Sequence, residues 1–499
     1  MSLALVLLSL LACTRDVEDT GDPTADPTAG DLTRREDGWL RGDLHMHSTW
    51  SDGWDDVATV VAIAESLEDP TFVAAHPEYE GRGLDFMALT DHRTFDAWSD
   101  PAYTSDRLIL LGGEEWGSSS HAGAWGITAL VEHDPDGDGL DAGDIARSIA
   151  ETHAQGGAFS PNHPFSPGIP FPWDVRGHDA IEVWNAGWSL MSQDVTQETL
   201  VTWEASHGPA SPMYRRAVQE RGGGSAYQSL KWYEAQLSRG IHVALVGGSD
   251  RHALLPVGSP TTWVQADQPD IAGVIAGIKA RHTFVARSPV GPQLAVEVDY
   301  LERSYAMGDA IPLGDSAQAT VRVRVARAQG ARVLLIAGGA VSSDEALVDA
   351  PLGAVLVEEQ LTGDRGTIEA TVALTPGAWF YPLVLEPLFE EGATAQQREE
   401  LRALAQTVAD VGDESFLDLA SALLPYVDTD VLWDGSQCDP DAWEPDQLQC
   451  MTADADGLAT FWAPDAYNRV LNAWTEDGQV TDWCVGAVGS AVRFAEVDR

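Results

Sequence analysis

Two histidines separated by one residue, His45 and His47, have a spacing that would let both bind one metal ion. They lie in the stretch GDLHMHSTWSDG, residues 42–53. On a strand, side chains alternate between two faces, so both imidazoles would project from the same side. Two neutral imidazoles on one face make half of a metal site. Taken alone, the pair is better explained as two surface histidines, so the interpretation depends on the rest of the chain.

Further histidines and carboxylates occur in similar short polar stretches. The full set of candidate ligands is His45, His47, Asp52, His92, Glu115, His121, His163, Asp250 and His252. This set contains six of the 13 histidines of the sequence, which argues against a chance pattern. Mixed imidazole and carboxylate ligation suits Zn, Mn or Fe, and a bridging carboxylate lets two ions lie close together. The sequence therefore predicts a site for two or three such ions.

The segments around these residues alternate between strand-like and helix-like patterns. We predict strands over residues 40–45, 85–90, 108–111, 124–131, 158–159, 180–184 and 243–246. We predict helices over residues 57–67, 144–153, 230–239 and 271–280, with Asp144 as the cap of the second. Nearly all candidate ligands follow the C-terminal end of a strand, which is where α/β barrels build their active sites. Residues 39–290 are thus expected to form an α/β barrel with a parallel sheet.

After residue 291 the pattern changes to alternating or apolar runs separated by turn residues. The runs cover residues 294–298, 319–325, 331–336, 367–374 and 379–385. This is typical of an all-β sandwich, here over residues 291–390. Residues 391–480 have a helical pattern at 398–411 and are then irregular, which predicts an insertion. A last strand at 485–494 would let residues 481–499 close the sandwich.

The N-terminus predicts export. Residues 1–12 are an apolar run too short to span a bilayer as a helix, which needs about 20 residues. The run ends at Cys13 and resembles a bacterial lipobox, although no Lys or Arg precedes it and Leu11 is large for its position. Residues 14–38 are acidic and poor in bulky apolar side chains, so we expect a disordered linker. The sequence predicts a lipoprotein of the cell envelope anchored at Cys13; the alternative is an ordinary cleaved signal peptide.

Charge and cysteine content limit the partners and the covalent links. The formal net charge of −49 repels nucleic acid and anionic lipid, so neither is an expected partner and any membrane contact is left to the anchor. In an exported protein Cys438 and Cys450 are expected to form a disulfide, although Cys484 leaves the pairing open.

The order of the motifs resembles the PHP (polymerase and histidinol phosphatase) superfamily of metallohydrolases. The motifs are HxH at 45–47, Ser-Asp-Gly at 51–53, Thr-Asp-His at 90–92, Gly-x-Glu at 113–115, His121, Asn-His-Pro at 162–164 and Gly-Ser-Asp-x-His at 248–252. The resemblance covers residues 39 to about 290 and implies a distorted (β/α)7 barrel. Glu-Val-Trp-Asn at 182–185 and the predicted sandwich look more like its carbaryl-hydrolase-like (CehA/McbA) branch.

The resemblance also implies a division of the ligands among three ions. One ion would take His45, His47, Glu115 and Asp250; a second would share Glu115 and add His121 and His163; a third would take Asp52, His92 and His252. Glu115 is preferred over Glu114 because it fits the Gly-x-Glu spacing. A hydroxide bridging the first two ions, held through Glu115 and Asp250, would be the nucleophile. Asp43 and Asp91 would orient ligands, or could simply cap turns.

Two further groups of residues leave alternatives open. Arg93 and Arg251 flank candidate ligands and would either contact an anionic substrate or face solvent. Asp134, Asp136 and Asp138 have the spacing of a calcium loop, but Ile145 stands where such a loop has its last glutamate. The alternative for this segment is an acidic turn.

Together these features predict a metal-dependent hydrolase that acts on a small molecule. A phosphoester is the leading substrate class, and hydrolysis of a carbamate, ester or amide at the same site is the alternative reaction. The alternative from another class is a non-catalytic surface lipoprotein whose metals only stabilise it.

Overall fold

The computed structural model describes residues 32–33, 37–66, 74, 81, 83–186, 194–252, 257–314, 318–389, 394–396, 398–399, 402–403, 405–406, 473–476 and 479–495. The predicted signal peptide, nearly all of the predicted linker, the cysteines Cys13, Cys438 and Cys450 and most of the predicted insertion lie outside these residues. Those expectations stay predictions. None of the helices within the described ranges is long and apolar enough to cross a membrane.

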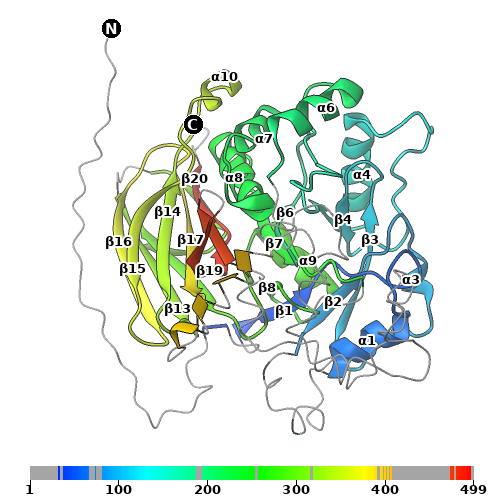
Figure 1. Cartoon of the computed structure of the whole chain (residues 1–499), viewed down its shortest axis with the longest axis horizontal. Coiled ribbons are helices and arrows are strands. Elements are labelled where there is room, and N and C mark those ends of the chain that lie inside the picture. Colours follow the sequence, from blue (N-terminus) through cyan, green and yellow to red (C-terminus); the bar gives the residue numbers. More distant parts are fainter. Residues whose placement is uncertain are drawn as a thin grey trace.

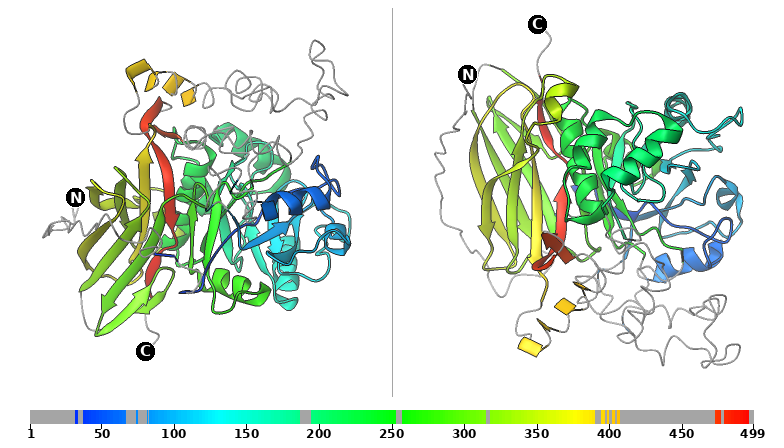
Figure 2. Two further views of the ribbon diagram at one scale, coloured as in Figure 1. Left: turned by 90° about the horizontal axis from the view of Figure 1, so that it is seen from below. Right: turned by 45° about the horizontal axis from the view of Figure 1, so that its top comes forward.

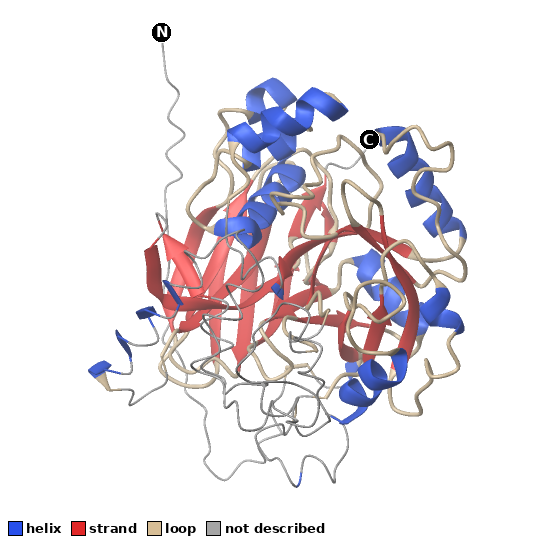
Figure 3. Ribbon diagram, turned by 45° about the vertical axis from the view of Figure 1, so that its right-hand side comes forward, coloured by secondary structure: helices blue, strands red, loops and turns tan. Residues whose placement is uncertain are grey.

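Strands and helices alternate in the first half of the chain. The strands are β1 (Trp39–Asp43), β2 (Phe86–Leu89), β3 (Ile109–Trp116), β4 (Ala122–Trp125), β5 (Ala158–Pro161), β6 (Ala180–Asn185), β7 (Ala244–Gly248), β8 (Thr261–Gln265) and β9 (Thr283–Ala286). The helices are α1 (Val57–Ser66), α3 (Asp96–Ser99), α4 (Ala142–Ala154), α6 (Gln197–His207), α7 (Pro212–Ala217), α8 (Gly224–Ser238) and α9 (Ile271–Ala280). Figure 3 shows the strands inside and the longer helices around them.

The strands of this half pair in both directions. β1, β2 and β3 are parallel, whereas β3–β4, β4–β5, β1–β8 and β8–β9 are antiparallel. β6 and β7 are parallel and form a two-stranded sheet of their own. The expectation of a purely parallel sheet was therefore wrong. The connection from β3 to β4, residues 117–121, is too short for a parallel crossover. The fold is mixed α/β, and closure into a (β/α)7 barrel stays a prediction.

The second half is built almost entirely of strands. They are β10 (Gln293–Tyr300), β11 (Arg303–Ala306), β12 (Ala310–Pro312), β13 (Gln318–Ala326), β14 (Arg332–Gly338), β15 (Ala354–Gln360), β16 (Gly366–Ala373), β17 (Trp379–Pro387), β18 (Ala473–Glu476), β19 (Gln479–Gly489) and β20 (Val492–Ala495), with one short helix, α10 (Asp344–Leu347). A four-stranded antiparallel sheet, β11-β10-β13-β16, buries one face against β14, β17, β19 and β20. Val323, Leu335 and Phe380 are among the side chains of the shared core.

One continuous sheet joins the two halves. It has 14 strands, and the link is the antiparallel pairing of β9 with β19, where Ala286 lies opposite Ala487. Figure 1 shows the first half with its helices beside the strands of the second, and in Figure 2 the red strands of the chain end run between them. The C-terminal strands therefore bridge both halves, in addition to pairing within the second.

Several predicted boundaries were wrong by a few residues. β1 ends at Asp43, so the two histidines follow the strand and are not inside it. β3 is longer than predicted and contains Glu115. Helix α4 is capped by Asp141, whose carboxylate accepts from the backbone N–H groups of Gly143 and Asp144. The carboxylate of Asp144 in turn accepts from the backbone N–H of Asp141. This reciprocal capping box places the cap three residues before the predicted one.

Candidate metal centre

The segment that carries the two histidines is held extended although it lies outside a strand. The N–H of His47 donates to the carbonyl of Arg251 at 2.9 Å, and the N–H of Asp250 donates to the carbonyl of His45 at 2.9 Å. Met46, between the histidines, is fully buried in the apolar cluster around α1. Because neighbouring side chains of an extended chain point to opposite sides, both imidazoles face away from that core. They face Asp250 on the segment alongside.

The innermost group of ligand atoms comes from His45, His47, Glu115 and Asp250. The Nε2 atom of His45 lies 3.1 Å from Oε1 of Glu115 and 3.2 Å from Oδ1 of Asp250. The Nε2 atom of His47 lies 3.4 Å from Oε2 of Glu115 and 3.3 Å from the same Oδ1. All four residues are buried, and one ligand atom of each lies within 4.8 Å of the others. This is the composition and spacing of a metal site.

Glu115 lies at the centre of a second group. The Nδ1 atoms of His92 and His121 lie 3.0 and 3.3 Å from its two carboxylate oxygens, and Nε2 of His163 lies 3.0 Å from Oε1. Its neighbour Glu114 points to the opposite face of β3, where it accepts from the N–H of Val131 at 2.7 Å. The structure thus brings Glu115, and not Glu114, into the cluster.

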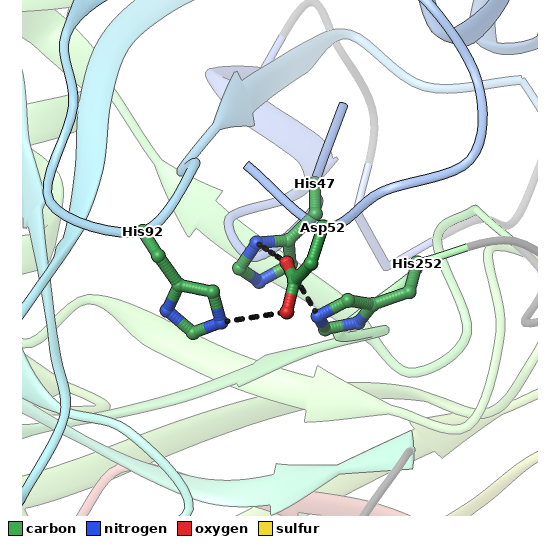
Figure 4. A group of neighbouring side chains, drawn as sticks. All are labelled: His47, Asp52, His92 and His252. Carbon is green, nitrogen blue, oxygen red and sulfur yellow. Dashed lines mark ion pairs between the residues drawn. The ribbon is translucent and has the colours of Figure 1, made fainter. Parts of the chain in front are cut away.

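An outer group is arranged around Asp52. Its carboxylate lies between three rings, 3.2 Å from Nε2 of His252, 3.4 Å from Nε2 of His92 and 3.6 Å from Nδ1 of His47 (Figure 4). His92 and His47 therefore face this group with one ring nitrogen and the inner groups with the other. The resemblance assigned His92 to the outer ion alone and His47 to the inner one alone. In the structure each of these two rings lies between Asp52 and the inner carboxylates, so each could serve either group.

Exposure rises steadily from the inner to the outer group. The side chain of His45 is fully buried, that of His92 is 15% exposed, that of His252 35% and that of Asp52 58%. The cluster therefore opens to solvent at the Asp52 end.

Buried polar atoms without hydrogen-bond partners test whether these groups fit a metal ion. Within the described residues such atoms include Nε2 of His47, Nδ1 of His92 and of His121, Oε2 of Glu115 and Oδ1 of Asp250. Burying an unpaired polar group costs about 1–3 kcal/mol, so five of them in one place need a common partner. All five are ligand atoms that metals bind, and the residues present therefore fit divalent metal ions.

The electrostatics of the cluster point to the same need for positive charge. Burial opposes the charged form of Glu115 and Asp250, but the surrounding histidines outweigh it and hold the pKa of both carboxyls well below the usual range. Burial likewise opposes protonation of His92, yet Asp52 and Glu115 raise its pKa to about 10. Burial lowers the pKa of His121. Two buried carboxylates that stay ionised require cations beside them, either imidazolium or metal.

The ring of His45 is oriented by a residue to which sequence analysis gave no role. Oε1 of Glu182, in β6, lies 3.0 Å from Nδ1 of His45, and Oε2 accepts from the N–H of His163 at 2.7 Å. Asn162 donates to Oε1 of Glu115 at 3.1 Å. The available signal was the carboxylate of Glu182 inside the otherwise apolar run of β6.

Asp43 and Asp91 hold the segments that carry the ligands in place, through hydrogen bonds to backbone N–H groups and serine hydroxyls. The buried carboxylate of Asp43 accepts from the N–H groups of His45, Ser249 and Gly258. That of Asp91 accepts from the N–H and hydroxyl of Ser48 and from the hydroxyl of Ser51. Within the described residues, the hydrogen bonds of both carboxylates come from backbone N–H and serine hydroxyl groups, so each acts on the ligands through the segments that carry them.

The remaining candidates lie outside the three groups of ligand atoms. Arg251 is 1% exposed and its Nη2 lies 2.7 Å from Oδ2 of Asp55, so it neither faces solvent nor has room to meet a substrate. Arg93 is exposed and donates to the carbonyl of Gly117. Asp134, Asp136 and Asp138 gather at the surface, where Asp134 accepts from the N–H groups of Gly137 and Gly139. This arrangement suits an acidic turn as well as a calcium loop, and calcium stays a prediction.

No protein-family model and no curated protein matches the sequence. Among solved structures, the chain is similar to a two-domain protein from Bacteroides vulgatus that contains a predicted PHP-like metal-dependent phosphoesterase. The two are 14% identical, and the match covers 67% of this chain and 95% of that chain with a TM-score of 0.30. A likeness at this level carries no conclusion about the activity of this protein.

Proposed function

We propose that this protein is a metal-dependent hydrolase of the PHP superfamily and that its substrate is a phosphoester. The observation that carries the proposal is the convergence of buried, unpartnered ligand atoms from His47, His92, Glu115, His121 and Asp250. A protein stabilised by one structural metal needs four ligands in a closed shell. Here adjoining groups share ligands and one end is open to solvent, which favours catalysis over a purely structural role.

In the proposed site His45, His47, Glu115 and Asp250 would hold the inner ion, and Glu115 with His92, His121 and His163 would hold a second. Asp52, His92 and His252, with His47 beside them, would hold an outer ion. Divalent ions there would lower the pKa of a bound water toward neutrality and polarise the oxygen under attack. Glu115 is the carboxylate common to the two inner groups.

The protein's own contribution is orientation and control of water. Glu182 holds the ring of His45 and the backbone of His163 at once, so that both rings keep one orientation. Asn162 keeps the Glu115 carboxylate from turning. Because only the Asp52 end is exposed, the substrate is expected to approach from that side.

The test measures metal content and turnover together. The full-length protein should contain at least two first-row metal ions per chain and hydrolyse bis(4-nitrophenyl) phosphate. Chelation should abolish turnover, and Zn²⁺ or Mn²⁺ should restore it. Turnover of an aryl carbamate or ester without any phosphoesterase activity would replace the phosphoester with the alternative substrate class. Bound metal without activity on any of these substrates would overturn the enzyme proposal in favour of a binding protein.

A further inference from the structure

A buried ion pair joins the two segments that supply the outer ligands. Arg251 immediately precedes His252, and Asp55 follows Asp52 by three residues. Nη2 of Arg251 lies 2.7 Å from Oδ2 of Asp55, with the arginine side chain 1% and the aspartate side chain 13% exposed. None of the three guanidinium nitrogens of Arg251 has a well-aligned hydrogen bond in the described part of the chain. Its buried charge is therefore balanced through the close ion pair with Asp55 and, from farther away, by Asp43.

Backbone hydrogen bonds also hold the segments that carry this pair. The N–H of Trp54 donates to the carbonyl of His252 at 2.7 Å, and the N–H of Thr49 donates to the carbonyl of Asp55 at 2.9 Å. The first bond connects the loop to the 250–252 segment, and the second closes the loop on itself. The Arg251–Asp55 ion pair adds a buried side-chain contact between these segments, beside the contact of Asp52 with His252.

The outer group needs such a constraint more than the inner one. Its central ligand, Asp52, is 58% exposed, whereas the carboxylates of the inner group are at most 7% exposed. An exposed carboxylate on a loop has many rotamers and loses more side-chain entropy when it binds an ion. A loop whose backbone is already held loses less, and its site binds more tightly.

We propose that Arg251 and Asp55 are positioning residues that hold Asp52 and His252 at ligand distance, and so set the affinity of the outer metal position alone. The inference rests on the proposed metal site and adds to it an order of occupancy. The inner positions, held by buried ligands and by Glu182, fill first. The outer position fills last, and its affinity falls when the pair is broken.

The experiment loads the full-length chain with Co²⁺ and removes the ions with graded chelator, following both visible absorption and metal content. Asp52→Asn identifies the outer ion as the one it removes. In Arg251→Met we expect that ion to bind about 10–100-fold more weakly, the usual effect of losing a partner outside the ligand shell, with the inner ions unchanged. Asp55→Asn should give the same selective loss, and Arg251→Lys should recover part of the affinity because it keeps the charge.

The matched control is Arg287→Met, which breaks another buried arginine–carboxylate pair, with Nε of Arg287 2.5 Å from Oε2 of Glu386. It should lower stability comparably and leave every Co²⁺ affinity unchanged. Equal weakening of all ions in Arg251→Met, or unchanged affinity of the outer ion in a folded Asp55→Asn, would overturn the positioning role. If the wild-type chain binds no Co²⁺ at all, the proposed metal site itself fails, which is a different result from either of these.

Discussion

Two neighbouring glutamates show how strongly the chemistry of this protein depends on the face of one strand. Glu115 points into the cluster, where histidines hold its pKa well below the usual range. Glu114 points to the other face of β3, where burial raises its pKa to about 8. Near neutral pH the first is an anion that can bind metal, and the second is mostly a neutral acid that accepts one backbone bond.

Replacing each glutamate by glutamine should therefore have opposite consequences. Glu115→Gln removes the carboxylate shared by the inner positions. We expect metal content to fall and kcat/KM to drop by more than about 100-fold, since even outer partners of a metal are worth 10–100-fold. Glu114→Gln resembles the neutral form already present, and it should keep both metal and activity. Metal analysis and steady-state kinetics of the purified pair check this, and equal losses in the two variants would contradict the assignment of Glu115.

At this scale the sequence was most informative. The nine candidate ligands were named from motifs alone, and the structure brings all nine into one cluster. The role of Glu182 could not be predicted, because nothing local shows that a residue 137 positions away would contact the ring of His45. For Arg251, the sequence left open a contact with an anionic substrate. Burial against Asp55 excludes that contact, and burial depends on the tertiary fold.

Among the elements, the loop between β1 and α1 is closely constrained by its own backbone. It turns sharply so that Asp52 comes back toward His47, and the N–H groups of Ser51 and Gly53 both donate to the carbonyl of Ser48. A Cβ at position 53 would lie 2.5 Å from the carbonyl carbon of His47 and 2.6 Å from its oxygen. These are backbone atoms that cannot rotate away, so the close approach requires glycine.

Gly53→Ala should therefore displace the loop. We expect a loss of about 1–3 kcal/mol in the free energy of unfolding, the usual cost of overpacking, together with weaker binding of the outer ion. Gly168→Ala is the matched control, because a Cβ there meets nothing within 4 Å. Its stability should stay within about 0.5 kcal/mol of the wild type. Denaturant unfolding and metal titration measure both effects. If Gly53→Ala had the stability and metal affinity of the wild type, the loop would have relaxed without cost.

Elements were predicted less completely than residues. Apolar runs such as Phe86–Leu89 and Ala244–Gly248 were recognised because strands buried on both faces carry few polar side chains. The strands β8, β9, β11, β12, β15 and β18 were missed. β8 and β9 have no alternation to separate them from loops, and their pairing partners β1 and β19 are remote in sequence. Strand pairing of this kind is non-local and leaves little trace in a short window.

Across the whole molecule, helix α8 connects the metal-binding half to the strand-rich half. Its fully buried Glu234 accepts from the hydroxyl of Tyr381 in β17 at 2.5 Å and from the N–H of Gly353 at 2.7 Å. Lys231 supplies the counter-charge at 3.0 Å. Together with the β9–β19 pairing, these contacts make it difficult for one half to unfold without the other. A change that loosens α8 should thus lower the stability of the entire chain.

His178 provides such a change through pH. Its ring stacks on Trp232 of α8, and its Nε2 lies 3.0 Å from Oε1 of Gln236 on the same helix. Burial lowers its pKa to about 4, only partly offset by Gln236 and by the charge of Asp179. Above pH 6.5 the ring is neutral in both the folded and the unfolded chain. As the pH falls from 6.5 toward 4 the unfolded chain gains a proton that the folded chain refuses, so stability is lost over this window.

The loss should approach about 3 kcal/mol at pH 4, since each pH unit contributes about 1.4 kcal/mol. His178→Gln keeps a neutral donor beside Gln236 but cannot take up a proton. It should be less stable than the wild type at pH 7, because it loses the stacked ring, and the difference should shrink by up to that amount as the pH falls to 4. Urea unfolding of both proteins at each pH measures it, and protonation of other groups cancels in the comparison. A difference that stays constant with pH would show that His178 is protonated in the folded chain as readily as in the unfolded one, and would contradict its role in acid sensitivity.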